Sequence, residues 1–337
     1  MVTKQDNYFQ ALRAVAIIAV VLIHSAGAGI RPIEDNETLE IIFRQFINYA
    51  VPMFLFISGY FVNKDAISSA TIVKKLKRLL IPYFLWSGVG IVLAWNFGLK
   101  HLIYTLLTGQ AMAQLYFIVV FAQLVILTPL IVKTLGNKKL TVLMLLITPA
   151  FLVGCYSYYY ISNRYIGFPY NALPFITWLM FYYLGILCKN SPKTRDIITK
   201  YIGLACLGYV VGIFLSIFEG LSIYHFDSSW FGFATSQIKI SSFLTSFFLI
   251  WIAMYLHGKI QIRSRLLVYI GNNSFGIFFI HILVMRLVSK TGVLSNITNQ
   301  VAYATLNAAI TIGVSLLLIF LAKKALGEKV SRSYLGF

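Results

Sequence analysis

The segment RAVAIIAVVLIH, residues 13–24, is an unbroken run of Ala, Val, Ile and Leu between one arginine and one histidine. With its apolar neighbours it reaches the roughly 20 residues that a helix needs to cross a bilayer. The rest of the chain repeats this pattern, since 59% of its 337 residues are hydrophobic and only 11% are charged. Long apolar stretches joined by short basic connectors are typical of a polytopic α-helical membrane protein, and they exclude an ordinary soluble domain.

We therefore expect an all-α fold of about ten transmembrane helices with both termini in the cytoplasm. The predicted spans are 8–28, 41–63, 79–98, 114–133, 140–158, 172–189, 201–219, 233–256, 266–287 and 301–322. In this orientation 20 Lys and Arg lie in inside segments and 7 in outside segments, as the positive-inside rule requires. The segment 99–110 is too short to cross and is expected to be interfacial or re-entrant. No soluble domain is visible, so residues 1–337 are predicted to form a single membrane-embedded domain.

The net charge of +18 does not indicate a nucleic-acid partner. Most of the Lys and Arg flank apolar segments, where orientation in the membrane explains them. The three cysteines, Cys155, Cys188 and Cys206, lie in or beside apolar segments and lack the spacing of a Cys/His site. We therefore predict neither a disulfide framework nor a metal site.

Arg13 and His24 are the two ionisable groups of the first span. Eleven residues correspond to about 1100° of helix, about 20° from three whole turns, so both side chains lie on one face roughly 16 Å apart. Such groups are costly in a bilayer unless they face a bundle interior or a wet cavity. In one interpretation Arg13 extends to the inner headgroups and His24 lies near the outer interface. In the other, the pair lines a polar channel through the bundle.

Three further motifs follow in order: VPMFLFISGYF at 51–61, KKLKRLLIPYF at 74–84 and NNSFGIFFIH at 272–281. With the Arg-x10-His span they resemble the acyltransferase-3 family of membrane acyltransferases over nearly the whole chain. Within it, the chain looks most like stand-alone sugar O-acetyltransferases, such as those that modify O-antigen or enterobacterial common antigen. It departs from the family pattern where an acidic residue, a glycine and a tryptophan are usual; these positions are Gln10, Ala14 and Tyr116.

Lys75 and Arg78 are three residues apart, so they share a helix face and can bind one anion. Attraction to lipid headgroups explains the same charges. The resemblance instead assigns them, with Lys74 and Arg13, to the phosphates of acetyl-CoA, for which guanidinium groups offer bidentate contacts.

Ser274 and His281 are seven residues apart and again share a face. His281 is therefore a second catalytic candidate beside His24 and Arg13, although a core histidine bonded to a neighbouring helix is an equal alternative. Ser274 and Tyr116 are candidate substrate-binding residues. Ser58 and Gly59 are expected to allow close helix packing.

The resemblance implies a membrane O-acyltransferase of the bacterial inner membrane. An acetyl group would move from cytoplasmic acetyl-CoA to a hydroxyl of an extracytoplasmic or lipid-linked sugar, and no metal would take part. His24 would act as general base or carry the acetyl group transiently. Membrane lipid is the expected surrounding, and an oligomer is compatible with this role. The competing class is a transporter or flippase for a glycan or lipid-linked sugar, because intramembrane charges also mark transport pathways.

Overall fold

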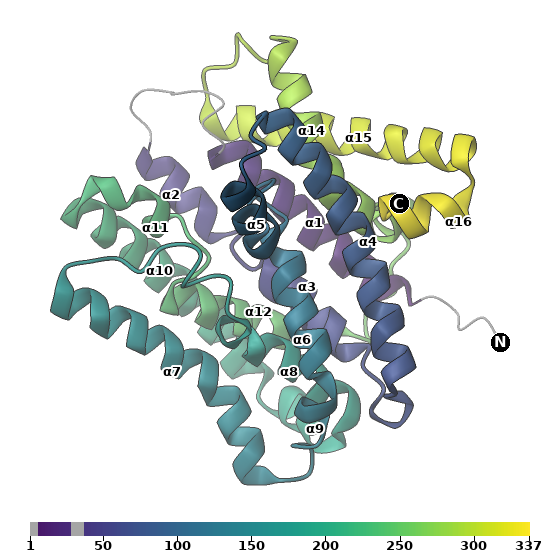
Figure 1. Ribbon diagram of the computed structural model, residues 1–337. Coiled ribbons are helices and arrows are strands. Elements are labelled where there is room, and N and C mark those ends of the chain that lie inside the picture. Colours follow the sequence, from purple (N-terminus) through teal and green to yellow (C-terminus); the bar gives the residue numbers. More distant parts are fainter. Residues whose placement is uncertain (1–5, 28–36) are drawn as a thin grey trace. The chain divides into compact units, whose positions relative to one another are not determined.

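The computed structural model describes residues 6–27 and 37–337, which form helices joined by turns and contain no strand (Figure 1). These residues divide into two compact units. The first unit holds the described residues up to Phe54 together with Lys193–Leu318, and the second holds Leu55–Pro192 together with Ile319–Phe337. The prediction of a single membrane-embedded domain stays a prediction.

The first unit contains both motifs that carry a candidate histidine. Its helices are α1 (Asn7–Gly27), α2 (Glu37–Gln45), α9 (Pro192–Lys200), α10 (Ile202–Phe226), η3 (Ser228–Trp230), α11 (Phe231–Ala234), α12 (Ile240–Leu256), α13 (Arg265–Asn272), α14 (Ser274–Lys290) and the larger part of α15 (Gln300–Leu326).

The second unit contains the KKLKRLLIPYF motif. Its helices are most of α3 (Ala50–Tyr60), η1 (Lys64–Ala66), α4 (Ser69–Ala94), α5 (Leu99–Thr108), α6 (Tyr116–Val132), α7 (Lys138–Ser162), η2 (Phe175–Thr177), α8 (Leu179–Asn190), the end of α15, α16 (Glu328–Val330) and η4 (Ser331–Leu335).

Among the described residues, 6 helices are long and apolar enough to cross a membrane, or 7 if a bent pair counts as one span. The six are Asn7–Ser25, Glu37–Tyr60, Ser69–Ala94, Lys138–Ser162, Ile202–Phe226 and Gln300–Leu326. Two shorter apolar helices, α6 and α12, coincide with predicted spans 114–133 and 233–256. The chain is thus a multi-pass, all-helical membrane protein, while the count of ten spans and the cytoplasmic termini stay predictions.

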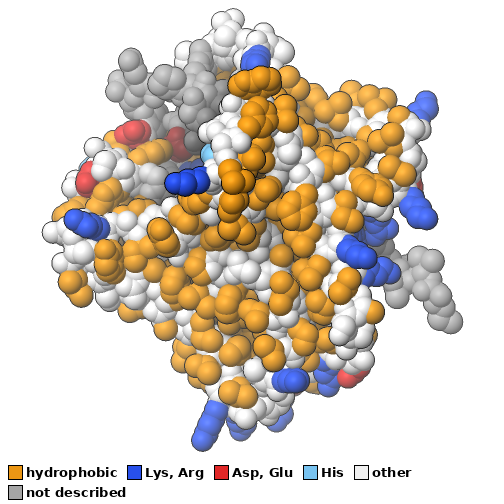
Figure 2. Space-filling view, viewed as in Figure 1, with side chains coloured by type: hydrophobic (Ala, Val, Ile, Leu, Met, Phe, Trp, Pro, Cys, Tyr) orange, Lys and Arg blue, Asp and Glu red, His pale blue; other side chains and the backbone are white. Residues whose placement is uncertain are grey.

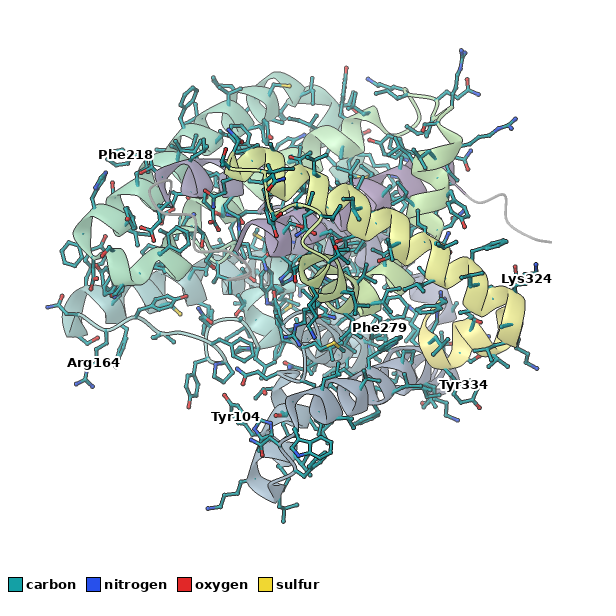
Figure 3. The ribbon with its side chains drawn as sticks, turned by 90° about the horizontal axis from the view of Figure 1, so that it is seen from above. Tyr104, Arg164, Phe218, Phe279, Lys324 and Tyr334 are labelled. Carbon is teal, nitrogen blue, oxygen red and sulfur yellow. The ribbon has the colours of Figure 1, made fainter. Side chains whose placement is uncertain are left out.

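Large apolar side chains remain exposed on the long helices, as lipid contact requires. Phe84, Val92 and Leu93 of α4 are each more than half exposed, and Phe218 of α10 is 71% exposed. Side chains of this kind cover much of the face shown in Figure 2. By contrast, Phe279 of α14 is 0% exposed and lies among the helices of its unit in Figure 3, whereas Phe218 points outward there. An exposed apolar surface of this extent would aggregate in water, so these faces are lipid-facing.

The span predicted over 266–287 consists of two helices that together are long and apolar enough to cross a membrane but are bent at a break between them. Helices α13 and α14 meet at an angle of 78°. The break lies at Asn273, whose side chain donates a hydrogen bond to the Tyr269 carbonyl at 2.8 Å. Asparagine side chains compete with the helical backbone for hydrogen bonds in this way, and they favour helix ends. The break lets α13 pack along α1 while α14 takes a separate direction.

Glycines set the closest helix contacts within each unit. In the first unit, a Cβ on Gly271 of α13 would lie 1.9 Å from the carbonyl oxygen of Gln10 in α1. In the second unit, a Cβ on Gly59 of α3 would lie 2.0 Å from the Tyr182 carbonyl of α8, and one on Gly185 would lie 2.1 Å from the Phe56 carbonyl. The expectation that Gly59 permits close helix packing is confirmed.

Candidate functional site

The two candidate histidines of the first unit lie side by side, although 257 residues separate them in the sequence. The ring centroids of His24 in α1 and His281 in α14 are 5.2 Å apart, with an angle of 47° between the ring planes. The same two helices make a second contact one turn beyond His281, where the hydroxyl of Ser25 in α1 lies 4.0 Å from the sulfur of Met285 in α14. Both Ser25 and Met285 are almost fully buried. The two motifs therefore converge on one place inside the unit.

The hydrogen bonds of His281 define its tautomer. Its Nδ1 lies 2.8 Å from the Phe278 carbonyl and 3.1 Å from the Ile277 carbonyl. Because carbonyl oxygens only accept, Nδ1 carries the proton and a neutral ring keeps its lone pair on Nε2. The side chain is 0% exposed, and among the described residues Nε2 has no hydrogen-bond partner. His281 thus presents an available basic nitrogen beside His24.

Arg44 of α2 supplies a positive charge next to this pair. Its Nη1 donates a hydrogen bond of 3.0 Å to the carbonyl of Ile23, the residue before His24. Its charge is close enough to act on the His24 ring. The preceding helical turn carries Glu40, which is 6% exposed and accepts a hydrogen bond of 2.6 Å from Gln300 of α15. Sequence reasoning did not select Arg44, although its spacing of four residues from Glu40 is that of an ion pair on one helix face.

Arg13 lies on α1, three helical turns from His24, and the structure does not bring the two side chains together. Its Nη1 lies 3.4 Å from Oε1 of Gln10, a long hydrogen bond within the helix. Gln10 is 3% exposed and occupies the position where the family usually has an acidic residue. A neutral amide therefore contacts Arg13 in this chain.

Ser274 begins α14 two turns before His281 and is 6% exposed. The two residues belong to one continuous helix, so the predicted common face holds. Asn273 is 4% exposed, and its amide is already bonded to Tyr269. The break between α13 and α14 thus carries two buried polar side chains, those of Asn273 and Ser274.

The remaining sequence candidates belong to the second unit. Lys74 and Arg78 of α4 are exposed, and Lys75 is half-buried. Tyr116 opens α6, and its ring centroid lies 5.9 Å from that of Phe168 in an edge-to-face contact. The cationic candidates thus belong to α4 of the second unit, whereas the histidine pair belongs to the first unit.

Sequence reasoning did not identify Lys239, a buried lysine of the first unit that joins two helices. Lys239 is 0% exposed. Its Nζ donates to Oε1 of Gln45 at 2.6 Å, to the Ala234 carbonyl at 2.9 Å and to the Ser236 carbonyl at 3.3 Å. These three acceptors match the three protons of the ammonium group. Lys239 therefore joins the start of α12 to α2, the helix that carries Arg44.

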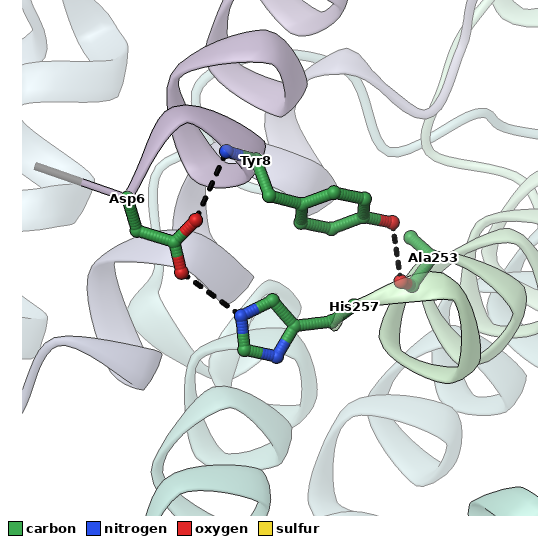
Figure 4. A network of polar contacts seen from close by, with 4 residues as sticks. All are labelled: Asp6, Tyr8, Ala253 and His257. Atoms are coloured by element: carbon green, nitrogen blue, oxygen red, sulfur yellow. Dashed lines mark hydrogen bonds and ion pairs between the residues drawn. The ribbon is translucent and has the colours of Figure 1, made fainter. Parts of the chain in front are cut away.

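The opposite end of α1 is held by a second polar group of contacts (Figure 4). Asp6 and His257 form an ion pair with 2.9 Å between Oδ2 and Nε2. The hydroxyl of Tyr8 donates to the Ala253 carbonyl at 2.5 Å. His257 is partly exposed, and it ties the start of α1 to the end of α12.

Comparison with known proteins gives one match. The profile of a protein family described as an acyltransferase domain, Acyl_transf_3, matches residues 6–320 of the 337. No match was found among curated proteins or among solved structures.

Proposed function

The chain belongs to the acyltransferase-3 family, and from this premise we propose that it transfers an acetyl group from cytoplasmic acetyl-CoA to a hydroxyl of an extracytoplasmic or lipid-linked sugar. The family supports a membrane acyltransferase in general. The finer assignment is supported by the contact between His24 and His281, since a neutral imidazole beside a second one can accept a proton and return it. We place the protein in a bacterial inner membrane.

The proposed acetyl transfer uses the imidazole rings of His24 and His281. His24 takes the proton of the sugar hydroxyl as the oxygen attacks the thioester carbon. The tetrahedral intermediate collapses with breakage of the C–S bond, and the departing CoA sulfur receives the proton from the imidazolium. In the alternative order His24 first accepts the acetyl group, releases CoA and then passes the acetyl group to the sugar. In both orders Nε2 of His281 is the neighbouring proton acceptor.

Arg44 is the residue that we assign to the developing oxyanion. A fixed cation beside the reacting carbonyl stabilises the tetrahedral intermediate more than the starting thioester. The hydrogen bond from Arg44 to the Ile23 carbonyl holds the guanidinium next to the histidine pair. Lys75, Arg78 and Lys74 of α4, with Arg13, are proposed to bind the phosphates of the donor, and Ser274 and Tyr116 to contact the acceptor.

Transport of a glycan or lipid-linked sugar is the second candidate, and the 78° break between α13 and α14 favours it. Discontinuous helices commonly form substrate sites in transporters. The two functions differ in one measurable respect, because a transporter moves its substrate without consuming acetyl-CoA.

The test uses purified protein in proteoliposomes that contain a lipid-linked glycan extract, supplied with acetyl-labelled acetyl-CoA. We expect label in the glycan fraction and one free CoA thiol for each acetyl group transferred. The variant His24→Ala should lose this activity, while His225→Ala, which removes an exposed histidine of the same unit, should retain it. Glycan movement without release of CoA would instead establish transport, and full turnover by His24→Ala would refute the catalytic assignment.

A further inference from the structure

The C-terminal segment Gly327–Phe337 folds back onto α4 in the second unit. The chain reverses at Gly327, whose φ of +79° favours glycine. The indole nitrogen of Trp86 then donates a hydrogen bond of 3.1 Å to the Leu335 carbonyl. The rings of Trp86 and Phe337 lie 6.1 Å apart. The segment is therefore packed against α4, and this packing places residue 332 next to the motif that begins this helix.

A buried hydroxyl fixes the start of this packing. Ser331 is 0% exposed, and its side chain donates to the Ala322 carbonyl of α15 at 3.1 Å. The backbone of Phe337 donates in turn to the Ser331 carbonyl at 3.0 Å. Arg332 follows directly after this anchored residue, so its backbone position is set from both sides. Lys324 and Tyr334, labelled in Figure 3, point outward from the same region.

The segment brings a second arginine, Arg332, near Arg78 of α4. Arg78 and Arg332 are both exposed and close enough that their charges act on each other. Within the described part of the chain, neither guanidinium has a hydrogen-bond or ion-pair partner. Lys323 adds a third positive charge near Arg332, and Glu328 is the acidic group near Lys323. Like charges held together by packing repel one another, and a bound anion removes this cost.

We infer that the C-terminal segment completes a phosphate-binding site, in which Arg332 and Arg78 hold the phosphate groups of an anionic ligand. Two guanidinium groups suit a phosphorylated ligand because each can donate two parallel hydrogen bonds to phosphate oxygens. The family match ends at residue 320, so Arg332 comes from outside the matched domain. The ligand is the phosphorylated end of the acyl donor; this identification rests on the proposed function.

Direct binding tests the inference without using catalysis. Binding of CoA to the purified full chain is measured by calorimetry for the wild type, Arg332→Gln, Arg332→Lys and Lys324→Gln. We expect Arg332→Gln to raise the Kd about tenfold, Arg332→Lys to recover part of this loss, and Lys324→Gln, which removes an exposed lysine near the segment, to bind like the wild type. Pantetheine, which lacks the phosphates, should bind the wild type and Arg332→Gln equally.

A lipid headgroup offers the same phosphate chemistry, and vesicle composition separates the two sources. The measurements are repeated in phosphatidylcholine and in phosphatidylglycerol vesicles. A tenfold effect of Arg332→Gln in both compositions supports the donor as ligand. A CoA affinity that is insensitive to Arg332→Gln in phosphatidylcholine overturns the inference in favour of a lipid contact. If CoA binds through Arg332 but no acetyl group is transferred, the proposed function fails and the phosphate site stands.

Discussion

The contact between Gly271 and Gln10 provides a sharp test of how α1 is positioned. In Gly271→Ala the new Cβ would lie 1.9 Å from the Gln10 carbonyl oxygen, where real Cβ contacts essentially never fall below 3.0 Å. The α1 backbone must therefore retreat by about 1.1 Å, the difference between these distances. Overpacking of this kind typically costs about 1–3 kcal/mol of stability. A displacement of about 1 Å in a catalytic element can cost about 100-fold in rate.

Both effects can be measured on purified protein. We expect Gly271→Ala to lower the thermal unfolding midpoint in detergent by several degrees and to reduce acetyl transfer by about 100-fold. Gly313→Ala is the matched control, because it adds the same methyl group to another long helix of this unit, with nothing within 4 Å. It should leave both quantities unchanged. Wild-type stability and turnover in Gly271→Ala would refute the close approach of α13 to α1.

Two further substitutions probe the histidine pair and its support. Arg44→Gln removes the cation bonded at 3.0 Å to the Ile23 carbonyl, so we expect acetyl transfer to fall by about 100-fold, as for loss of an oxyanion donor; an unchanged kcat would remove Arg44 from the site. Lys239→Ala removes the three hydrogen bonds that the ammonium group donates to Gln45 and to the Ala234 and Ser236 carbonyls, and a hydrogen bond from a charged group contributes about 1.5–3 kcal/mol. Its unfolding midpoint should fall clearly in a thermal melt, whereas that of Lys259→Ala, an exposed lysine, should stay at the wild-type value.

Much of the fold could be predicted because apolar length alone identifies a membrane helix. The stretch RAVAIIAVVLIH lies within α1, and each predicted span coincides with a helix or an adjacent pair of helices. The break at Asn273 could not be placed, because apolar residues on both sides gave the appearance of one continuous span. The sequence did indicate this break, because Asn272, Asn273 and Ser274 are residue types that favour helix ends.

The site was predicted in part, for a related reason. Helical periodicity identifies residues that share a face, so it selected Arg13 with His24 and Ser274 with His281. It cannot show which faces meet, and the contact of His24 with His281 depends on the packing of α1 against α14. Lys239 bonds to Gln45 across 194 residues, a distance at which no local pattern carries information.

We propose that His24 and His281 serve one reaction, and a double-mutant cycle on acetyl transfer measures whether they act together. The rate of acetyl transfer from acetyl-CoA is measured for His24→Ala, His281→Ala and the double variant, with folding checked by thermal melts. Residues that act as a unit are strongly non-additive. We predict that each single variant loses at least about 100-fold and that the double variant is no slower than the slower single one. Losses that multiply in the double variant, or full turnover in either single variant, would show that the two histidines do not serve one reaction.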